Sequence, residues 1–258
     1  MSFSNKVVLI TGAGSGIGEA MALKFAKLSA TLSLIDRDDS VQKTCERCEK
    51  LSAAKVLKHV MDIRDDDLVQ KAVDDTVKEF GKIDVLINCA GIYRPDNGKI
   101  VDPKVMENFD ETMSVNLRAL IRMTHCVSSY LIQSKGCIVN IASIFAAMVT
   151  ESTFSYNISK SAVCHFTKCV ALELAPHGVR VNAIMPGPVR TNLMLNAGCS
   201  TERSEKNWMG AKAKVPLNKL IDAEEIAELA TYLASDSARS ITGGNYPLDG
   251  GFILRGSH

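Results

Sequence analysis

The chain has 258 residues, of which 46% are hydrophobic, and its 30 basic and 29 acidic side chains leave a formal charge of +1. This length and composition suffice for a sizeable globular core, and the near-neutral charge without long runs of one sign argues against a nucleic-acid or membrane surface. No apolar stretch approaches the roughly 18 to 20 residues of a membrane span, and the N-terminus lacks a signal-peptide pattern, so we expect a cytoplasmic protein with a small-molecule partner.

The cysteines and histidines do not form a metal-binding pattern. Eight cysteines are scattered without regular spacing, which predicts reduced thiols. Cys45 and Cys48 make a C-x-x-C in a polar helical stretch, but no second pair follows at the spacing of a zinc site. The five histidines form no H-x-x-x-H pair. The sequence therefore predicts no metal site.

The first predicted element is a buried strand, Val7–Thr11, followed by a glycine-rich loop and a helix start. Such a loop places free backbone N–H groups and the positive end of a helix dipole where a pyrophosphate can sit. Its glycines follow the pattern G-x-x-x-G-x-G, which is related to the dinucleotide fingerprint G-x-G-x-x-G but spaced differently. The alternative is a loop that only connects a strand to a helix. The candidate phosphate-binding residues are Gly12, Ser15, Gly16, Ile17 and Gly18.

The second strand, Leu32–Asp36, ends in an acidic residue eighteen positions after Gly18. The Asp36 carboxylate can accept hydrogen bonds from both hydroxyls of a ribose and repels the 2′-phosphate of NADP. Arg37 follows directly and is a residue type that can bind that phosphate. The acid, together with the absence of a basic residue at Ala13 or Ser15, favours NAD, with NADP as the alternative.

Strands and helices alternate along the rest of the chain. Continuous apolar strands joined by helices indicate a parallel sheet with right-handed crossovers. We therefore predict an α/β fold: one doubly wound, Rossmann-like parallel sheet of about seven strands with helices on both faces, in a single domain over 1–258. Residues 255–258 resemble the start of an expression tag and are excluded. The further strands are Lys55–Val60, Val85–Asn88, Cys137–Ala142, Val179–Ile184 and Ile241–Leu248, and the clearest helices are Leu68–Phe80, Lys104–Ser134, Phe154–Ala175 and Ala223–Leu233.

Ligands of such sheets bind beyond the carboxyl ends of the strands, so the residues that follow each strand are candidate site residues. They are Met61, Asp62 and Ile63 after the third strand, Asn88, Cys89, Ala90 and Gly91 after the fourth, Ser143 after the fifth, and Pro186, Gly187 and Pro188 after the sixth.

The segment 191–215 mixes apolar residues with Gly, Ser and Asn and is too long for an ordinary connection. We expect an irregular lid there rather than a disordered segment.

Tyr156 and Lys160 stand four residues apart on one face of a predicted helix, which makes them a candidate acid–base pair. A lysine ammonium nearby favours the phenolate and lowers the tyrosine pKa. Tyr156 could then exchange a proton with a carbonyl or alcohol oxygen that Ser143 hydrogen-bonds. Taken alone, the pair is better explained as part of an ordinary helix surface, since this spacing occurs by chance in many helices. Its joint placement with the glycine loop, Asp36 and Ser143 in one crevice is what favours chemistry.

Together these motifs resemble the short-chain dehydrogenase/reductase family over essentially the whole chain. The segment 11–18 resembles the family's T-G-x-x-x-G-x-G loop, and 88–91 its N-x-A-G turn. The resemblance implies a catalytic tetrad of Asn116, Ser143, Tyr156 and Lys160, in which Asn116 anchors a water that links Lys160 to solvent. The segment with Pro186, Gly187, Val189 and Thr191 resembles the family's P-G-x-x-x-T segment. The resemblance implies that Val189 and Thr191 hold the nicotinamide carboxamide and that Lys160 hydrogen-bonds the nicotinamide ribose. It also implies that Asp62 and Ile63 lie at the adenine.

Simpler structural roles remain open for several of these residues. Asn88 and Gly91 could serve only the turn. Asp62 could only cap the helix that starts near Asp65, and Asn116 could be an ordinary surface amide.

The leading hypothesis is an NAD(H)-dependent oxidoreductase that interconverts a secondary alcohol and a ketone. Apolar residues of the expected lid and of the segment after Ser143 indicate a hydrophobic substrate. The alternatives are a 3-oxoacyl carrier-protein reductase that uses NADPH, although no conspicuous basic patch is present, and a dinucleotide-binding regulatory protein without turnover. The apolar residues are Leu193, Met194, Leu195, Trp208 and Met209 in the lid and Ile144, Phe145 and Met148 after the serine.

Surplus apolar residues on two predicted helices suggest self-association. We expect a homotetramer, built from a four-helix interface and a second one near 243–251, with a monomer as the alternative. The residues are Leu117, Leu120, Ile121, Met123, Cys126 and Val127 on the first helix and Val163, Phe166, Val170, Leu172 and Leu174 on the second.

Overall fold

The computed structural model describes residues 2–52, 55–94, 100–151 and 153–255. Its centre is a seven-stranded sheet in the order β3-β2-β1-β4-β5-β6-β7, with every neighbouring pair parallel. The predicted fold class is thereby confirmed. The strands are β1 Val7–Thr11, β2 Thr31–Asp36, β3 Val56–Val60, β4 Val85–Asn88, β5 Cys137–Ile141, β6 Arg180–Pro186 and β7 Asn245–Leu248.

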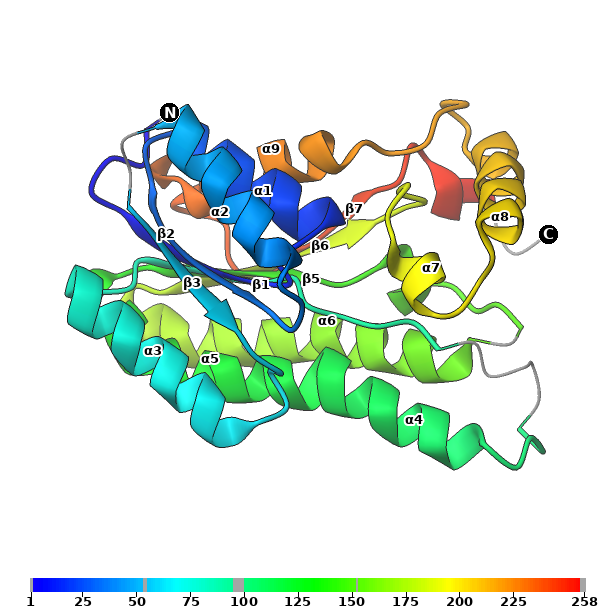
Figure 1. Cartoon of the computed structure of the whole chain (residues 1–258). Coiled ribbons are helices and arrows are strands. Elements are labelled where there is room, and N and C mark those ends of the chain that lie inside the picture. Colours follow the sequence, from blue (N-terminus) through cyan, green and yellow to red (C-terminus); the bar gives the residue numbers. More distant parts are fainter. Residues whose placement is uncertain (1, 53–54, 95–99, 152, 256–258) are drawn as a thin grey trace.

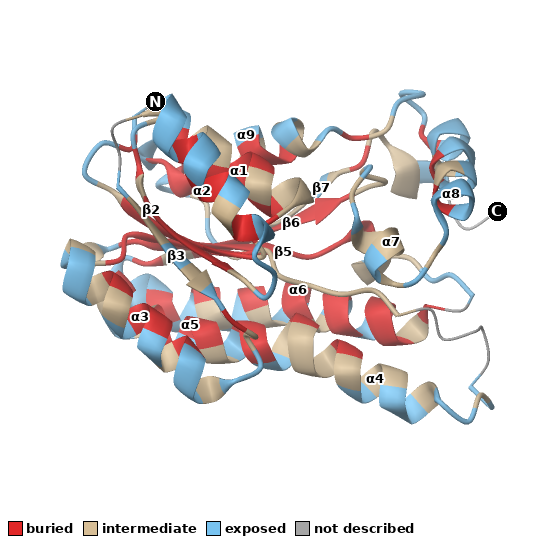
Figure 2. Ribbon diagram, in the orientation of Figure 1, coloured by how far each residue is buried: buried red, intermediate tan, exposed pale blue. Residues whose placement is uncertain are grey.

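Helices cover both faces of this sheet (Figure 1). On one face lie α1 (Gly16–Lys27), α2 (Ser40–Leu51) and α9 (Ala223–Ala234), and on the other α3 (Asp66–Phe80), α5 (Leu120–Ser134) and α6 (Phe154–Leu174). Strands β1, β4 and β5 are buried at every position, and the helices turn their buried sides toward the sheet (Figure 2). The hydrophobic core is therefore double, with one layer on each face of the sheet.

The long helix predicted over 104–134 is interrupted. The structure has α4 (Val105–Met113), then a π-helical turn Ser114–Ala119, then α5. A π turn carries one extra residue per turn and often marks a functional position, and this one contains Asn116. The prediction was wrong in this detail because hydrophobic periodicity does not register a single inserted residue.

The segment 191–215 is largely helical, which corrects the expectation of an irregular segment. It forms α7 (Leu193–Asn196) and α8 (Thr201–Lys214). The Ser200 hydroxyl accepts a hydrogen bond from the Arg203 N–H and thus caps α8. Helix α8 buries little hydrophobic surface, since Trp208 is its only buried hydrophobic residue. The hydrophobic periodicity of a helix is therefore weak in this part of the sequence.

Differences at the ends of the elements are small except at β7. That strand begins at Asn245 instead of Ile241, because Gly243 has a φ of +75° and turns the chain before the strand. Arg255 closes a 3-10 turn, Phe252–Arg255, and its side chain donates to the Ala213 carbonyl, so it is part of the folded chain. Residues 256–258 of the suggested tag lie outside the described residues.

No helix in the described part of the chain is long and apolar enough to cross a membrane. Within the same residues, His, Cys, Asp and Glu side chains nowhere gather in threes as a metal ion would need. Cys45 and Cys48 are buried between α2 and the core, and burial raises the pKa of the two thiols to about 11 and about 12. Both are therefore protonated core residues.

Candidate active site

The glycine-rich loop after β1 has a shape that only glycines permit. Gly12 has a φ of +70°, and a Cβ there would come 2.8 Å from the Ala90 backbone. A Cβ on Gly18 would come 1.9 Å from the Gly12 carbonyl oxygen, so a side chain at either position would push the loop apart. The loop ends at Gly16, the first residue of α1, so free N–H groups of the helix face the adjoining cavity.

Asp36, at the end of β2, is fixed by two backbone hydrogen bonds. One carboxylate oxygen accepts from the Gly14 N–H at 2.8 Å, and the other accepts from the Asp38 N–H at 3.2 Å. The carboxylate therefore has a defined position at the edge of the cavity and keeps lone pairs for a further donor. Arg37 also lines the cavity, but its half-exposed side chain contacts Asp38 at 3.5 Å and does not reach Asp36.

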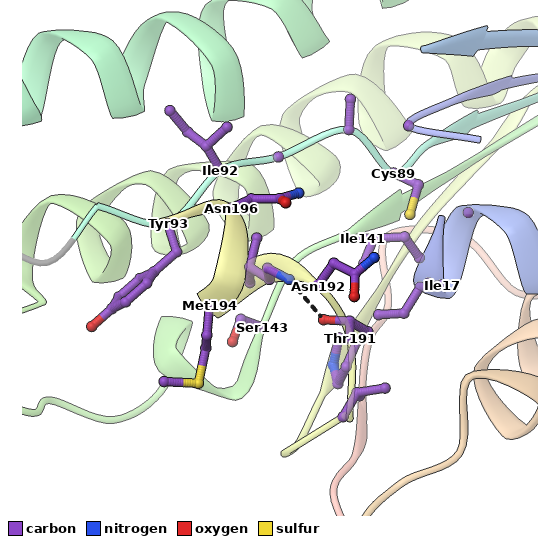
Figure 3. A pocket seen from close by; sticks show the side chains of 18 of the residues that line it. Ile17, Cys89, Ile92, Tyr93, Ile141, Ser143, Thr191, Asn192, Met194 and Asn196 are labelled. Atoms are coloured by element: carbon purple, nitrogen blue, oxygen red, sulfur yellow. Dashed lines mark hydrogen bonds between the residues drawn. The ribbon is translucent and has the colours of Figure 1, made fainter. Parts of the chain in front are cut away.

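One cavity of about 450 Å³ joins these elements with the carboxyl ends of β4, β5 and β6. In Figure 3, Ile17, Ser143 and Thr191 approach the same space from three separate parts of the chain. The volume lies within the range of small-molecule sites. The predicted site residues that line it are Gly12, Ser15, Gly16, Ile17, Gly18, Asp36, Arg37, Met61, Asp62, Ile63, Cys89, Ala90, Gly91, Ser143, Tyr156, Lys160, Pro186, Gly187, Pro188, Val189 and Thr191.

The candidate catalytic side chains Ser143, Tyr156 and Lys160 lie together in the middle of this cavity. Tyr156 and Lys160 project from the first turns of α6, and the Lys160 Nζ lies 5.6 Å from the centre of the Tyr156 ring. The Ser143 side chain lies in the same cavity and acts on the proton affinity of the Tyr156 hydroxyl. Both α6 residues are nearly enclosed, with 8% and 4% of their surfaces exposed.

Burial dominates the proton affinities of this group. It raises the pKa of Tyr156 to about 12, against the opposing effect of the Ser143 side chain. It lowers the pKa of Lys160 to about 8. The expected lowering of the tyrosine pKa by Lys160 is not found, because the ammonium donates to the Ile141 carbonyl at 2.8 Å and lies over the ring instead of at the hydroxyl. The phenol is therefore the stable form at neutral pH.

Asn116 and Asn88 lie beside the cavity and do not line it. The Asn116 amide accepts from the Ile92 N–H at 2.8 Å and donates to the Ile92 carbonyl at 3.0 Å and to the Ser159 hydroxyl at 3.1 Å. It is 1% exposed, so the alternative of a surface amide is wrong. Asn88 donates to Thr124 and to Asn140 and thus ties β4 to its neighbours.

Asp62 does not cap a helix, so that alternative is also wrong. The N-cap of α3 is Asp65, whose side chain accepts from the N–H groups of Asp67 and Leu68. Asp62 instead pairs with Arg64, with Nη2 and Oδ2 2.5 Å apart, and this pairing lowers the pKa of the Asp62 carboxyl. It lies between β3 and α3 and lines the cavity wall, with both carboxylate oxygens engaged by Arg64.

Several cavity residues were not singled out from the sequence. Tyr93 packs edge-on against the Tyr156 ring with centroids 5.6 Å apart, and Arg94 forms an ion pair with Glu111. Both follow the 88–91 turn, so the rule that sites lie beyond strand ends could have found them. Glu111 comes from a helix and carries no such signal.

Comparisons with known proteins agree with this arrangement. Residues 12–253 match a family model described as enoyl-(acyl carrier protein) reductase. A (+)-borneol dehydrogenase from Salvia officinalis is 36% identical over 96% of this chain and 89% of its own length. A 3-oxoacyl-(acyl-carrier-protein) reductase from Thermotoga maritima is 35% identical over 98% of this chain and all of its own.

Among solved structures, a 3-ketoacyl-(acyl-carrier-protein) reductase from Brucella melitensis complexed with NADH has a TM-score of 0.84 and 34% identity, and the match covers 97% of this chain and 99% of that one. The sequence matches and the structural match thus extend over nearly all of the chain, the glycine loop and the tetrad positions included. The chain belongs to the short-chain dehydrogenase/reductase family, whose members are oxidoreductases that bind a nicotinamide dinucleotide and act on small molecules.

Proposed function

We propose that the protein is an NAD(H)-dependent oxidoreductase that interconverts a secondary alcohol and a ketone on a small hydrophobic substrate. The observation that carries this proposal is the meeting of Ser143, Tyr156 and Lys160 in the same cavity as the glycine loop and Asp36. The loop geometry and the free N–H groups of α1 fit a pyrophosphate, and the fixed Asp36 carboxylate fits a ribose diol.

A nicotinamide dinucleotide held by the glycine loop and Asp36 would supply or accept the hydride at the substrate's carbinol carbon. Tyr156 donates its phenolic proton to the carbonyl oxygen during reduction. In the reverse direction its phenolate form, generated through the proton relay, removes a proton from the alcohol. Ser143 hydrogen-bonds the same oxygen, and the Lys160 ammonium stabilises negative charge that develops on the phenol oxygen. The Asn116 side chain binds the backbone of Ile92 and, like Lys160, lies next to Gly91. Asn116 therefore helps to position Lys160 and is the proposed anchor of the proton relay.

The walls around Tyr156 favour an apolar substrate. The rings of Tyr93 and Phe145 flank the Tyr156 ring edge-on at 5.6 and 6.0 Å. Such walls fit a cyclic or branched hydrocarbon body better than a sugar, which would leave its hydroxyl groups unpaired. Leu193, Met194 and Trp208 of the proposed lid complete the lining, whereas Leu195 and Met209 do not contribute, and Met209 is 72% exposed on the outside of α8.

A carrier-protein reductase is the second candidate, supported by the relative from Thermotoga maritima. A panel of hydrophobic ketones and one 3-oxoacyl thioester, each supplied with NADH and with NADPH, separates the two. Our proposal expects turnover of the ketones with NADH. NADPH-dependent turnover of the thioester alone would support the second candidate, and binding of NADH without any turnover would support a regulatory protein.

The cofactor preference depends on Asp36 in this account. Asp36→Ala is expected to lower kcat/KM for NADH by about tenfold to a hundredfold, because hydrogen bonds from a ribose diol to a carboxylate are lost, and to narrow the preference over NADPH, which Arg37 can then bind. Steady-state kinetics with both cofactors check this, with Asp39→Ala, an exposed aspartate that does not line the cavity, as the matched control. A wild-type protein that already prefers NADPH would contradict the NAD assignment.

The proposed homotetramer has less exposed apolar surface to bury than the sequence suggested. Most of the residues expected at the interface pack inside the chain, among them Met123, Val127 and Val163, but Ile121 on α5 and Leu172 on α6 are 39% and 80% exposed. Ile158 on α6, which was not among the expected residues, is 46% exposed. Light scattering at micromolar concentration is expected to give about 112 kDa, four times the 27.9 kDa chain. A mass of one chain would contradict self-association.

A further inference from the structure

The segment 91–94 follows shortly after the carboxyl end of β4 and lines the cavity wall. The Asn116 side chain holds both the N–H and the carbonyl of Ile92, and the Tyr93 ring packs against the Tyr156 ring. These contacts attach the segment to the candidate catalytic residues. The position of Arg94, which comes next, is therefore fixed relative to Tyr156 by its two predecessors.

The Arg94 guanidinium is oriented by a two-point ion pair. Its Nε donates to the Glu111 Oε2 at 2.8 Å and its Nη2 donates to Oε1 at 2.9 Å. The two side chains are only 25% and 34% exposed, at the wall of the cavity. A paired contact of this kind fixes the plane of the guanidinium and leaves one nitrogen, Nη1, for another acceptor. That nitrogen donates to the Asn196 carbonyl of α7 at 3.4 Å and also contacts the Tyr93 carbonyl.

The contact with Asn196 is the main polar attachment of α7. In the described part of the chain, the other hydrogen bonds of residues 192–199 stay within the segment or reach only Thr191. A helix of four residues is too short to be stable by itself. Leu193, Met194 and Asn196 line the same cavity as Ile92 and Tyr93 (Figure 3).

We propose that Arg94 is a positioning residue that fastens α7 over the cavity, and that Glu111 holds the guanidinium in place for this task. The proposal rests on the proposed function, because it takes the ligand of the cavity to be NAD(H). Loss of the attachment makes α7 open more often and so speeds release of the dinucleotide. Because Tyr93 and Arg94 are adjacent, closure of α7 is also linked to the position of the Tyr156 ring.

The test is the rate of NADH release, measured by stopped-flow fluorescence when bound NADH is displaced by excess NAD⁺. Arg94→Ala is expected to raise the dissociation rate about tenfold, as loss of one charge-assisted hydrogen bond predicts, with the association rate within about twofold of wild type. Glu111→Gln should raise it by a smaller factor, since the amide still accepts one bond. Arg94→Lys should lie between wild type and Arg94→Ala, because an ammonium cannot reach both acceptors in the same geometry.

The matched control is Arg47→Ala, which removes an arginine–glutamate ion pair with Glu19 between α2 and α1, away from the cavity. Its dissociation rate is expected to equal that of wild type. A purely structural role of Arg94 would lower the melting temperature without changing the ratio of the two rates. Unchanged release in both Arg94→Ala and Glu111→Gln would overturn the proposal, and Glu111→Gln decides it alone if Arg94→Ala does not fold. A wild-type protein that fails to bind NADH would contradict the proposed function, and this proposal with it.

Discussion

Tyr156→Phe is expected to lower kcat for ketone reduction by about 10²- to 10⁴-fold, because it removes the proton that the carbonyl oxygen receives. The contacts of the ring with Tyr93 and Phe145 involve carbon atoms that phenylalanine keeps, so the cavity retains its shape. NADH affinity should therefore stay within about threefold of wild type. Steady-state kinetics and a fluorescence titration with NADH measure the two effects separately.

The matched control for this substitution is Tyr232→Phe, since Tyr232 lies on α9 and does not line the cavity. This substitution also removes a phenol oxygen, but at a position outside the cavity, and should leave kcat unchanged. Near-wild-type turnover by purified Tyr156→Phe would eliminate Tyr156 as the proton donor and with it the proposed mechanism.

Lys160→Met is expected to lower kcat by about 10²- to 10³-fold and to weaken NADH binding as well. The ammonium is buried beside the Tyr156 ring, where its charge acts with little screening from water. Methionine has a similar length, but it leaves the Ile141 carbonyl without its donor, so folding has to be checked by circular dichroism. Lys168→Met, an exposed lysine two turns further along α6, is the control.

The pH dependence gives Lys160 a second, independent signature. Burial lowers the pKa of this amine to about 8, so its positive charge is present below that pH and is lost as the pH rises through it. We expect kcat/KM for reduction, which reports groups of the free enzyme, to be flat below about pH 8 and to fall above it. Lys160→Met should show low activity without this falling limb. If kcat/KM of Lys160→Met still fell above about pH 8, the fall would belong to the titration of another group.

The fold and most of the cavity could be predicted because their signals are local. Each buried strand is a short apolar run, and the glycines at 12 and 18 are required by contacts within the loop and with the neighbouring turn. Since the carboxyl ends of parallel strands meet at one edge, the residues after each strand could be assigned to one site before the sheet was known. The family resemblance then added Asn116, which lies on a helix and follows no strand.

Other features depend on contacts between distant segments. The raised pKa of Tyr156 results from burial beneath several elements, and no spacing in the sequence expresses it. The ion pair of Arg94 with Glu111 joins residues seventeen positions apart, and its link to Asn196 spans more than a hundred. The helix α8 was missed because little of it packs against the core. Local patterns thus located the site, and tertiary contacts determine its proton affinities and its attachment to α7.

Transfer of deuterium from NADH to the substrate carbon tests the central claim most directly. Purified protein is incubated with a hydrophobic ketone from the panel and NADH deuterated at C4, on either face in separate reactions, and the alcohol is analysed by mass spectrometry and NMR. Our account predicts one deuterium at the carbinol carbon with one of the two labelled cofactors, and almost none with Tyr156→Phe over the same time. Binding of NADH without any deuterated alcohol across the panel would contradict it.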